Sequence, residues 1–326
     1  MSNVLVTGGG GFIGSHIVDK LLSMDYDVTV VDYQKNIPLN LKHHINNKKF
    51  KYIVCDVTNK KLLEEIISKD DYETIYHLAA VVGVKNYTEN PLNTINVNVI
   101  GTKNIIDIAL KNDIKILFTS TSEIFGKNPN IPWDEDSDRI LGSTRIHRWA
   151  YSTSKALCEH MLFAVYNKYK LPIVIVRYFN IYGPRQKPIF VIPSMIKRVL
   201  NGQNPIVFSD GEQTRCFTYI EDAVEGTILA ATKKVAEGEA FNIGSKFEMK
   251  IKDIAKLIIK LCGMDGKLYL EFKENHEVYS SYEDIKRRVP KVEKAKNLLG
   301  WIAKTTPEDG IKKTIEWYKK HPEYLS

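Results

Sequence analysis

Cysteine is scarce in this sequence, and long hydrophobic runs are absent. The 326 residues include only Cys55, Cys158, Cys216 and Cys262, which are scattered without the spacing of a metal site. We therefore expect reduced thiols and no metal centre. No window approaches the roughly 18 consecutive apolar residues of a transmembrane helix, which argues against a membrane protein. No basic segment followed by an apolar run precedes the first predicted strand, so we expect no signal peptide and a cytoplasmic location.

Concentrated charge and sequence repeats are also missing. The net charge of +7 comes mostly from lysines spread along the chain. They form no basic stripe with interleaved aromatic residues, so we do not expect nucleic-acid binding. No internal repeat and no low-complexity linker divides the chain. With 44% hydrophobic residues the chain can bury a large core, in one large domain or in two.

What the sequence does contain is an alternation of strand-like and helix-like segments. Strand patterns occupy residues 3–7, 28–31, 52–55, 74–78, 114–119 and 173–177, and helical patterns occupy 12–24, 60–68, 94–110 and 148–170. This order predicts an α/β fold with a Rossmann-like, doubly wound parallel sheet. We expect a dinucleotide-binding domain over 1–178, to which segments at about 217–245 and 290–310 return. The remainder of 179–326 is expected to form a smaller α/β substrate-binding region.

A glycine-rich loop follows the first predicted strand. The loop contains Gly8, Gly11 and Gly14. This spacing allows a tight turn, a close approach of the backbone to a phosphate and close packing of the helix on the strand. The helix that opens there presents free N–H groups to a pyrophosphate. Asp32 ends the second strand at about the expected ~20-residue separation, where a carboxylate can accept from both ribose hydroxyls. Because it also repels a 2′-phosphate, the sequence favours NAD over NADP.

A second motif lies at mid-chain. Tyr151 and Lys155 are four residues apart, so they share one face of the predicted helix. A nearby ammonium and the nicotinamide charge favour the phenolate form of the tyrosine. The phenolate can then accept the proton of a sugar hydroxyl while hydride leaves the same carbon.

A polar cluster ends the strand that starts at residue 114. A hydroxyl from Thr121 or Ser122 can hydrogen-bond the reacting oxygen, and Glu123 can act as base or acid beside a carbon acidified by a ketone. A helix N-cap is the structural alternative for this cluster.

Together these motifs resemble the extended short-chain dehydrogenase/reductases, specifically the NAD-dependent nucleotide-sugar epimerase/dehydratase group, over nearly the whole chain. The resemblance rests on the glycine loop, Asp56-Val57, His77 to Ala80, Thr121 to Glu123, Tyr151 to Lys155, Arg177 to Arg185, Gln213 to Arg215, Asp222 and Asn242 to Gly244. It implies NAD contacts from Phe12, Ile13, Asp56, Val57, Leu78, Ala79 and Ala80, and also from Tyr151 and Lys155. It also implies nucleotide-sugar contacts, with a UDP-linked sugar favoured, from Lys85, Arg148, Asn180, Arg185, Val191, Arg215 and Arg288. Members of the group often form homodimers through a four-helix interface, which would use the helices at 94–110 and 148–170.

The resemblance leaves the reaction open. Group members first oxidise C4 of the sugar, and Glu123 then favours decarboxylation or dehydration over simple epimerisation. The segments Arg148-Trp149-x-Tyr151, Gln213-x-Arg215-Cys216-Phe217 and 279–290 resemble UDP-glucuronate decarboxylases. A UDP-glucuronate decarboxylase is therefore the leading expectation. The alternatives are a 4,6-dehydratase acting on UDP-GlcNAc, UDP-glucose or GDP-mannose, a UDP-sugar or UDP-glucuronate 4-epimerase, and a non-catalytic NAD-binding protein.

Overall fold

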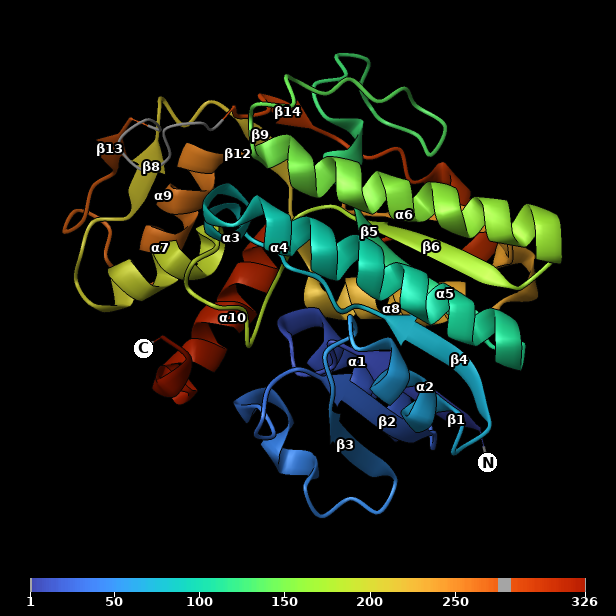
Figure 1. The fold of residues 1–326 in the computed structure, drawn as a ribbon. Helices are drawn as coiled ribbons and strands as arrows, with labels where there is room; N and C mark the ends of the chain where they lie inside the picture. The colour runs from blue at the N-terminus through green and yellow to red at the C-terminus, as the bar shows by residue number, and fades with distance from the viewer. Residues whose placement is uncertain (1, 275–282, 326) are drawn as a thin grey trace.

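Seven parallel strands form the central sheet of the molecule (Figure 1). The computed structural model describes residues 2–274 and 283–325. The spatial order is β11 (Glu239–Ile243), β6 (Ile173–Tyr178), β5 (Lys115–Thr121), β4 (Tyr72–His77), β1 (Asn3–Thr7), β2 (Asp27–Asp32) and β3 (Phe50–Val54). The chain winds from β1 out to β3 and then returns to β4 on the other side of β1. The doubly wound α/β fold is thus confirmed, and the β1–β4 junction is the switch point where ligands bind in such sheets.

Helices cover both faces of this sheet. α1 (Phe12–Ser23) and α8 (Ile220–Thr232) pack on one face, and α2 (Lys60–Ile67), α5 (Gly101–Asn112) and α6 (Arg148–Tyr169) pack on the other (Figure 1). Alternate residues of β1 serve the two cores: Val4 and Val6 join the cluster under α1, whereas Leu5 joins the cluster under α5 and α6. These strands are apolar on both faces because neither face meets solvent.

A second group of elements lies beyond the carboxyl edge of the sheet. It contains α7 (Val191–Leu200), α9 (Ile251–Leu261), α10 (Pro307–Lys320) and three small sheets. The small sheets pair β8 (Ile206–Phe208) with β13 (Glu271–Lys273), β7 (Ile181–Tyr182) with β10 (Thr218–Tyr219), and β9 (Thr214–Cys216) with β12 (Glu248–Lys250) and β14 (Arg287–Arg288). Arg288 lies directly beside Arg215 in the parallel β9–β14 pair, so the two side chains emerge together.

Short helical segments connect these elements. They are η1 (Leu39–His44), α3 (Val84–Glu89), α4 (Pro91–Ile95), η2 (Asn96–Ile100), η3 (Ser122–Phe125), η4 (Lys234–Ala236), η6 (Ala295–Leu299) and η7 (Pro322–Leu325). No helix in the described parts of the chain is long and apolar enough to cross a membrane.

The helix predicted over residues 94–110 is segmented. α4 starts after the Asn90 cap, and η2 is a π-helical turn that separates it from α5. The wide turn places Asn98 inside the protein, where its Oδ1 accepts from Val81 N at 3.0 Å and its Nδ2 donates to Ser154 Oγ at 3.1 Å. Hydrophobic periodicity alone could not show this, because a buried asparagine interrupts the apolar face.

Candidate active site

The glycine loop turns sharply between β1 and α1. Gly8 has φ of +69°, and a Cβ there would lie 2.8 Å from the Ala79 backbone. A Cβ on Gly14 would collide with the carbonyl oxygen of Gly8. Both positions therefore require glycine, and the loop leaves its backbone open to a ligand.

The amino end of α1 fits an anion. Among the described residues no side chain caps Gly11, and the first turn of α1 holds no acidic residue. The free N–H groups and the helix dipole can therefore serve a pyrophosphate, as dinucleotide binding requires. The flanking residues Phe12 and Ile13 are half-buried in the first turn.

Asp32 lies beside this loop. It is buried at the end of β2, and its Oδ2 accepts from Gly10 N at 3.0 Å while Oδ1 accepts from Gln34 N at 3.3 Å. The carboxylate is thus fixed next to the loop, where a ribose diol would lie.

Replacing Asp32 should therefore weaken NAD binding. We expect Asp32→Ser to raise the NAD dissociation constant about tenfold to a hundredfold, because hydrogen bonds to a charged group are lost. Discrimination against NADP should shrink as well. Calorimetric titration with both dinucleotides measures this, and Asp27→Ser at the other end of β2 is the control. Unchanged NAD affinity of Asp32→Ser would refute the assignment.

The remaining predicted cofactor residues line the same edge of the sheet. Asp56 is exposed and accepts from Thr58 N at 2.8 Å, whereas Val57 is buried against Gly101. Leu78, Ala79 and Ala80 follow β4, and Ala79 N donates to Thr7 Oγ1 at 3.2 Å. Ala79 thus lies beside the glycine loop, where its backbone also approaches Gly8, whereas Asp56 and Val57 follow β3 farther along the same edge of the sheet.

Tyr151 and Lys155 lie on α6 beside the end of β5. Lys155 Nζ donates to the carbonyl oxygen of Thr119 at 2.8 Å, and the Tyr151 ring stacks on Tyr87 with centroids 5.6 Å apart. Burial lowers the pKa of Lys155 to about 8. Burial, reinforced by Glu123, raises the pKa of Tyr151 above its usual range, and a hydrogen bond with Thr121 opposes this. These groups therefore keep the phenol protonated near neutral pH, and its role as the catalytic base stays a prediction.

The surroundings of Glu123 differ most from those expected from the sequence. Its carboxylate accepts two hydrogen bonds from Arg148 Nη2, at 2.9 and 3.1 Å, and one from Arg288 Nη1. Burial alone would raise the pKa of Glu123, but the two guanidinium groups hold it at about 2. A carboxylate held ionised in this way is a weaker base than a free glutamate, and the predicted role of Glu123 as acid or base stays a prediction. Thr121 Oγ1 accepts from Glu123 N at 3.2 Å, which confirms an N-cap contact, and Ser122 is buried beside it.

The depressed pKa of Glu123 makes stability depend on pH. Stability from the ionised carboxylate is complete above its ordinary pKa of 4.5 and is lost as the pH falls through about 2. We expect Glu123→Gln to lower the unfolding free energy by about 3 kcal/mol at pH 7 and by almost nothing at pH 2. Denaturant titrations between these pH values test this, with Glu316→Gln on the exposed side of α10 as the control. A pH-independent difference would contradict it.

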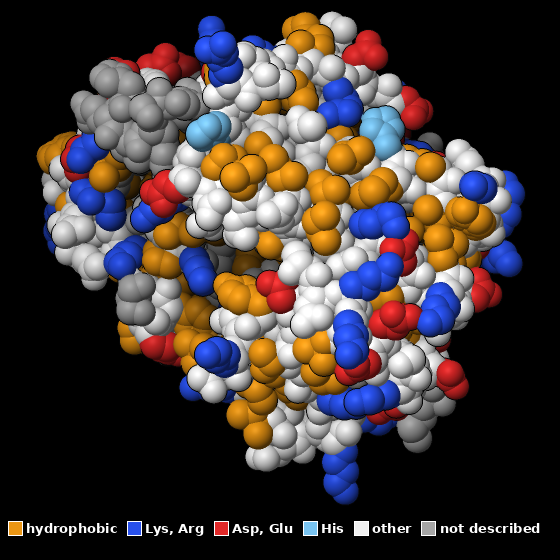
Figure 2. All heavy atoms as spheres, in the orientation of Figure 1, with side chains coloured by type: hydrophobic (Ala, Val, Ile, Leu, Met, Phe, Trp, Pro, Cys, Tyr) orange, Lys and Arg blue, Asp and Glu red, His pale blue; other side chains and the backbone are white. Residues whose placement is uncertain are grey.

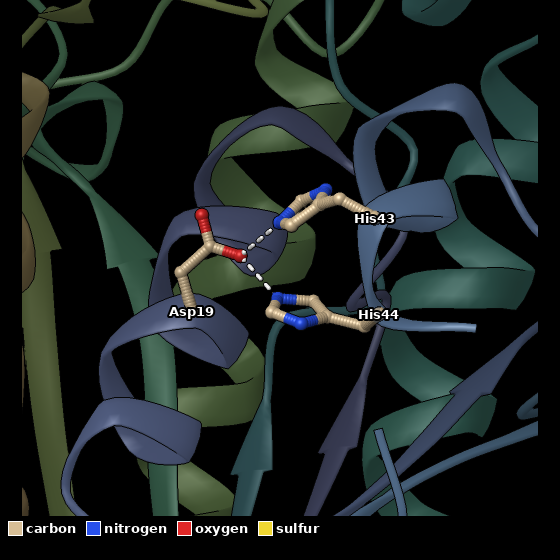
Figure 3. A group of neighbouring side chains, drawn as sticks. All are labelled: Asp19, His43 and His44. Carbon is tan, nitrogen blue, oxygen red and sulfur yellow. Dashed lines mark hydrogen bonds and ion pairs between the residues drawn. The ribbon is translucent and has the colours of Figure 1, made fainter. Parts of the chain in front are cut away.

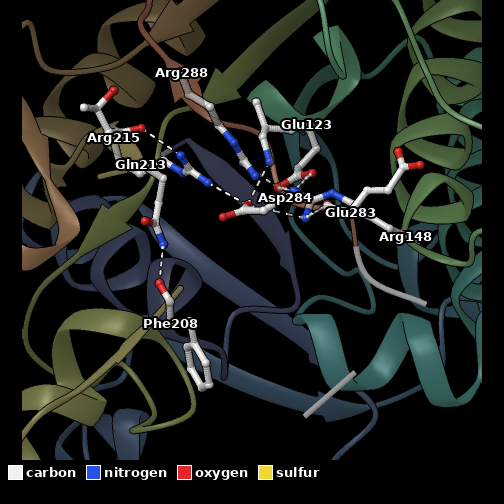
Figure 4. A network of polar contacts seen from close by, with 10 residues as sticks. Glu123, Arg148, Phe208, Gln213, Arg215, Glu283, Asp284 and Arg288 are labelled. Atoms are coloured by element: carbon white, nitrogen blue, oxygen red, sulfur yellow. Dashed lines mark hydrogen bonds and ion pairs between the residues drawn. The ribbon is translucent and has the colours of Figure 1, made fainter. Parts of the chain in front are cut away.

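A second carboxylate, that of Asp284, lies among these arginines. Arg215 Nη2 donates to Asp284 Oδ1 at 2.8 Å, and Arg148 Nη1 donates to the carbonyl oxygen of Glu283 at 2.8 Å (Figure 4). The side chains of Arg148, Arg215 and Arg288 are only 1%, 7% and 6% exposed. Arg148 and Arg288, from distant parts of the chain, therefore meet at Glu123, and Asp284 lies between Arg215 and Arg148. Asp284 was not predicted from the sequence, where its position four residues before Arg288 was the only available signal. Of the segment 279–290 noted there, residues 279–282 lie outside the described residues.

Four other predicted substrate residues have diverse surroundings. Asn180 adopts φ of +47°, and its buried Oδ1 has no hydrogen-bond partner among the described residues. Lys85 and Val191 are exposed at the starts of α3 and α7. Arg185 Nη2 instead pairs with Asp19 of α1 at 2.7 Å. The orphaned amide oxygen of Asn180 is available to a ligand, and the substrate roles of all four stay predictions.

Comparison with known proteins finds related sequences and structures among nucleotide-sugar enzymes. The sequence matches the GDP-mannose 4,6 dehydratase family over residues 5–314. It is 40% identical to a UDP-N-acetyl-alpha-D-glucosaminuronate decarboxylase of Bacillus cytotoxicus, covering 97% of each chain. A dTDP-glucose 4,6-dehydratase from Bacillus anthracis in complex with NAD superposes with a TM-score of 0.88 at 28% identity, covering 100% of both chains. A UDP-glucuronic acid 4-epimerase from Bacillus cereus, in complex with UDP-glucuronic acid and NAD, gives 0.84 at 30% identity, covering 98% of this chain and 99% of that one.

Proposed function

Because the chain belongs to the GDP-mannose 4,6-dehydratase family of NAD-dependent nucleotide-sugar enzymes, we propose that it decarboxylates a UDP-linked uronic acid. The observation that carries this proposal is the convergence of Arg148, Arg215 and Arg288 on two carboxylates, Glu123 and Asp284, of which Glu123 lies near Tyr151. A uronic acid linked to UDP brings a carboxylate and a diphosphate, and buried guanidinium groups pair with both.

Each residue of the site has its own role in the proposed reaction. Tyr151 accepts the proton of the C4 hydroxyl, while Thr121 hydrogen-bonds the same oxygen. Bound NAD⁺ would accept the hydride that leaves C4. The product of this step is a β-keto acid, which releases CO₂ as the electrons of the C5–C6 bond move toward the C4 ketone. A proton then adds to C5. We assign Arg215 and Asn180 to the diphosphate, and Arg148 and Arg288 to the carboxylate that leaves.

The state of Glu123 separates the candidate reactions. A 4,6-dehydratase would need a group that moves a proton between C5 and the leaving C6 hydroxyl, and a carboxylate held by two arginines is poorly suited to that. A 4-epimerase of a uronic acid would use the same arginines without losing CO₂. The epimerase is therefore the second candidate, supported by the likeness to the UDP-glucuronic acid 4-epimerase.

Mass spectrometry of the products tests the proposal directly. Purified protein and NAD⁺ are incubated separately with UDP-glucuronate, UDP-N-acetylglucosaminuronate, UDP-glucose, UDP-GlcNAc and GDP-mannose. Loss of CO₂ from a uronic acid is the expected result. An isomer of unchanged mass would establish the epimerase instead, and loss of water from a neutral sugar would make the protein a dehydratase.

We also propose how the chain is divided and where it acts. Residues 1–178, with the segments at about 217–245 and 290–310, would hold NAD, and the rest of 179–326 would hold the sugar nucleotide. The return of α8 and β11 to the main sheet supports this division. A cytoplasmic location is supported by the cysteines, all four of which are free.

A homodimer through α4, α5 and α6 is part of the proposal. Leu92, Ile95, Ile100 and Leu157 are 72%, 39%, 47% and 45% exposed, and hydrophobic side chains gather over these helices in Figure 2. An apolar patch of this kind marks an interaction surface. We expect Leu157→Asp to convert a dimer into a monomer in light scattering, whereas Val235→Asp, equally exposed on η4, should not. A monomeric wild-type protein would contradict the interface.

A further inference from the structure

Three side chains of types that commonly bind metals meet between α1 and η1. Asp19 lies on α1, and His43 and His44 end η1. The Nε2 atoms of His43 and His44 lie 2.9 and 2.6 Å from the same oxygen, Asp19 Oδ1 (Figure 3). All three donor atoms fall within 4.8 Å of one another.

The convergence of the two histidines is unexpected for neighbours in a 3₁₀ turn. Successive residues there project about 120° apart because the helix has 3.0 residues per turn. Both imidazoles nevertheless face Asp19, with ring centroids 4.0 Å apart. A carboxylate only accepts, so each Nε2 carries the hydrogen. Neither Nδ1 has a hydrogen-bond partner among the described residues, so each can take that hydrogen by tautomer exchange and leave an Nε2 lone pair facing the carboxylate.

We propose that Asp19, His43 and His44 bind one divalent transition-metal ion of the Zn²⁺, Co²⁺ or Ni²⁺ class. Imidazole with carboxylate is a donor set for these ions, whereas Mg²⁺ and Ca²⁺ require oxygen ligands. With bonds of about 2.0–2.1 Å, a tetrahedral ion spaces its ligands by about 3.3 Å. The observed contacts to Oδ1 need to open by less than an ångström. His43 is 47% exposed, which gives the ion a path from solvent and leaves room for a water ligand.

Arg185 sets the strength of this site. Its Nη2 lies 2.7 Å from Asp19 Oδ2, the oxygen that the histidines do not contact. The guanidinium orients the carboxylate as outer-shell partners of metal ligands do, but its charge opposes a second cation. Nearby His16 adds no such charge at neutral pH, because burial and Arg185 lower its pKa to about 4. We therefore expect the site to bind its ion more weakly than the same three ligands would without Arg185.

The site would join two elements that shape the cofactor loop. η1 already contacts that loop, since Asn40 Nδ2 donates to Gly10 O at 3.0 Å. An ion shared by α1 and η1 would hold them together in the folded state and would be released on unfolding. Bound metal should therefore raise the melting temperature of the protein.

Cobalt provides the direct test. The NAD-loaded, untagged protein is treated with chelator, dialysed and titrated with Co²⁺. We expect one equivalent to bind in the micromolar range with the visible absorption of a four-coordinate ion, and a rise in melting temperature. His44→Gln should weaken binding about tenfold or more and remove that rise. His321→Gln is the matched control, because His321 faces a single carboxylate, Glu323, at 3.3 Å.

His43→Asn repeats the test at a half-exposed position, where the fold should tolerate the change. The proposal is overturned if the wild-type protein takes up no Co²⁺ at micromolar concentrations, or if both histidine variants bind it as tightly as the wild type. Either result would show that the three side chains form an ion-pair cluster only. The product analysis of the proposed reaction is unaffected by this outcome.

Discussion

Replacing Tyr151 with phenylalanine should reduce kcat by a factor of about 10² to 10⁴, the range that a positioned acid–base group contributes. The variant loses only the phenolic oxygen. Its ring can still stack on Tyr87, and Lys155 can still bond to Thr119 O, so the fold and the cofactor loop should be unchanged. NAD should therefore bind with wild-type affinity. Steady-state turnover together with calorimetric NAD titration separates these two effects.

Tyr169→Phe is the matched control, since Tyr169 ends the same helix and is 55% exposed. It should turn over at the wild-type rate. Turnover of Tyr151→Phe within a few-fold of the wild type would remove the phenol from the chemistry and would favour a protein that only binds NAD. Loss of NAD binding in this variant would instead indicate a structural role for the hydroxyl.

The fold was largely predictable because its signals are local. Strand 3–7 was predicted with the bounds observed, and most other elements differ by one or two residues. Buried parallel strands appear as short β-branched runs, and amphipathic helices show a 3.6-residue period. The segment at 94–110 was misjudged because a buried Asn98, bonded to Val81 and Ser154, requires a π-helical turn that no periodicity shows.

In the candidate site, too, features set by local sequence were predictable and features set by distant segments were not. The glycine loop and the Tyr151–Lys155 pair are short motifs, so spacing alone predicts their geometry. The pairing of Glu123 with Arg148 and Arg288 depends on segments 25 and 165 residues away. Charge state follows from such contacts: Glu123 in isolation suggests a proton carrier, but between two guanidinium groups it is held ionised.

Removing the carboxylate of Glu159 should be the most damaging single change to stability outside the core. Glu159 and Arg177 are 5% and 6% exposed, and Arg177 donates to both carboxylate oxygens from Nε, at 3.1 and 3.2 Å, and again from Nη2 at 2.6 Å. Ser120 Oγ also donates to this carboxylate. We expect Glu159→Ala to lower the unfolding free energy by about 3–5 kcal/mol, because it leaves a buried guanidinium unpaired. Glu64→Gln breaks the exposed pair with Lys111 and should change stability far less in the same denaturant titration, because solvent screens that pair.

A double variant shows what the pair does beyond stability. Replacing both charges, as in Glu159→Leu with Arg177→Met, removes the unpaired charge and should recover most of the lost free energy. Ser120 would still lack its acceptor, and it lies between Thr119, which holds Lys155, and Thr121, which caps η3. We therefore expect a stable protein whose kcat stays below the wild-type value. Wild-type turnover in the double variant would mean that the pair only stabilises the fold, whereas equal damage in single and double variants would show that the unpaired arginine is not the cause.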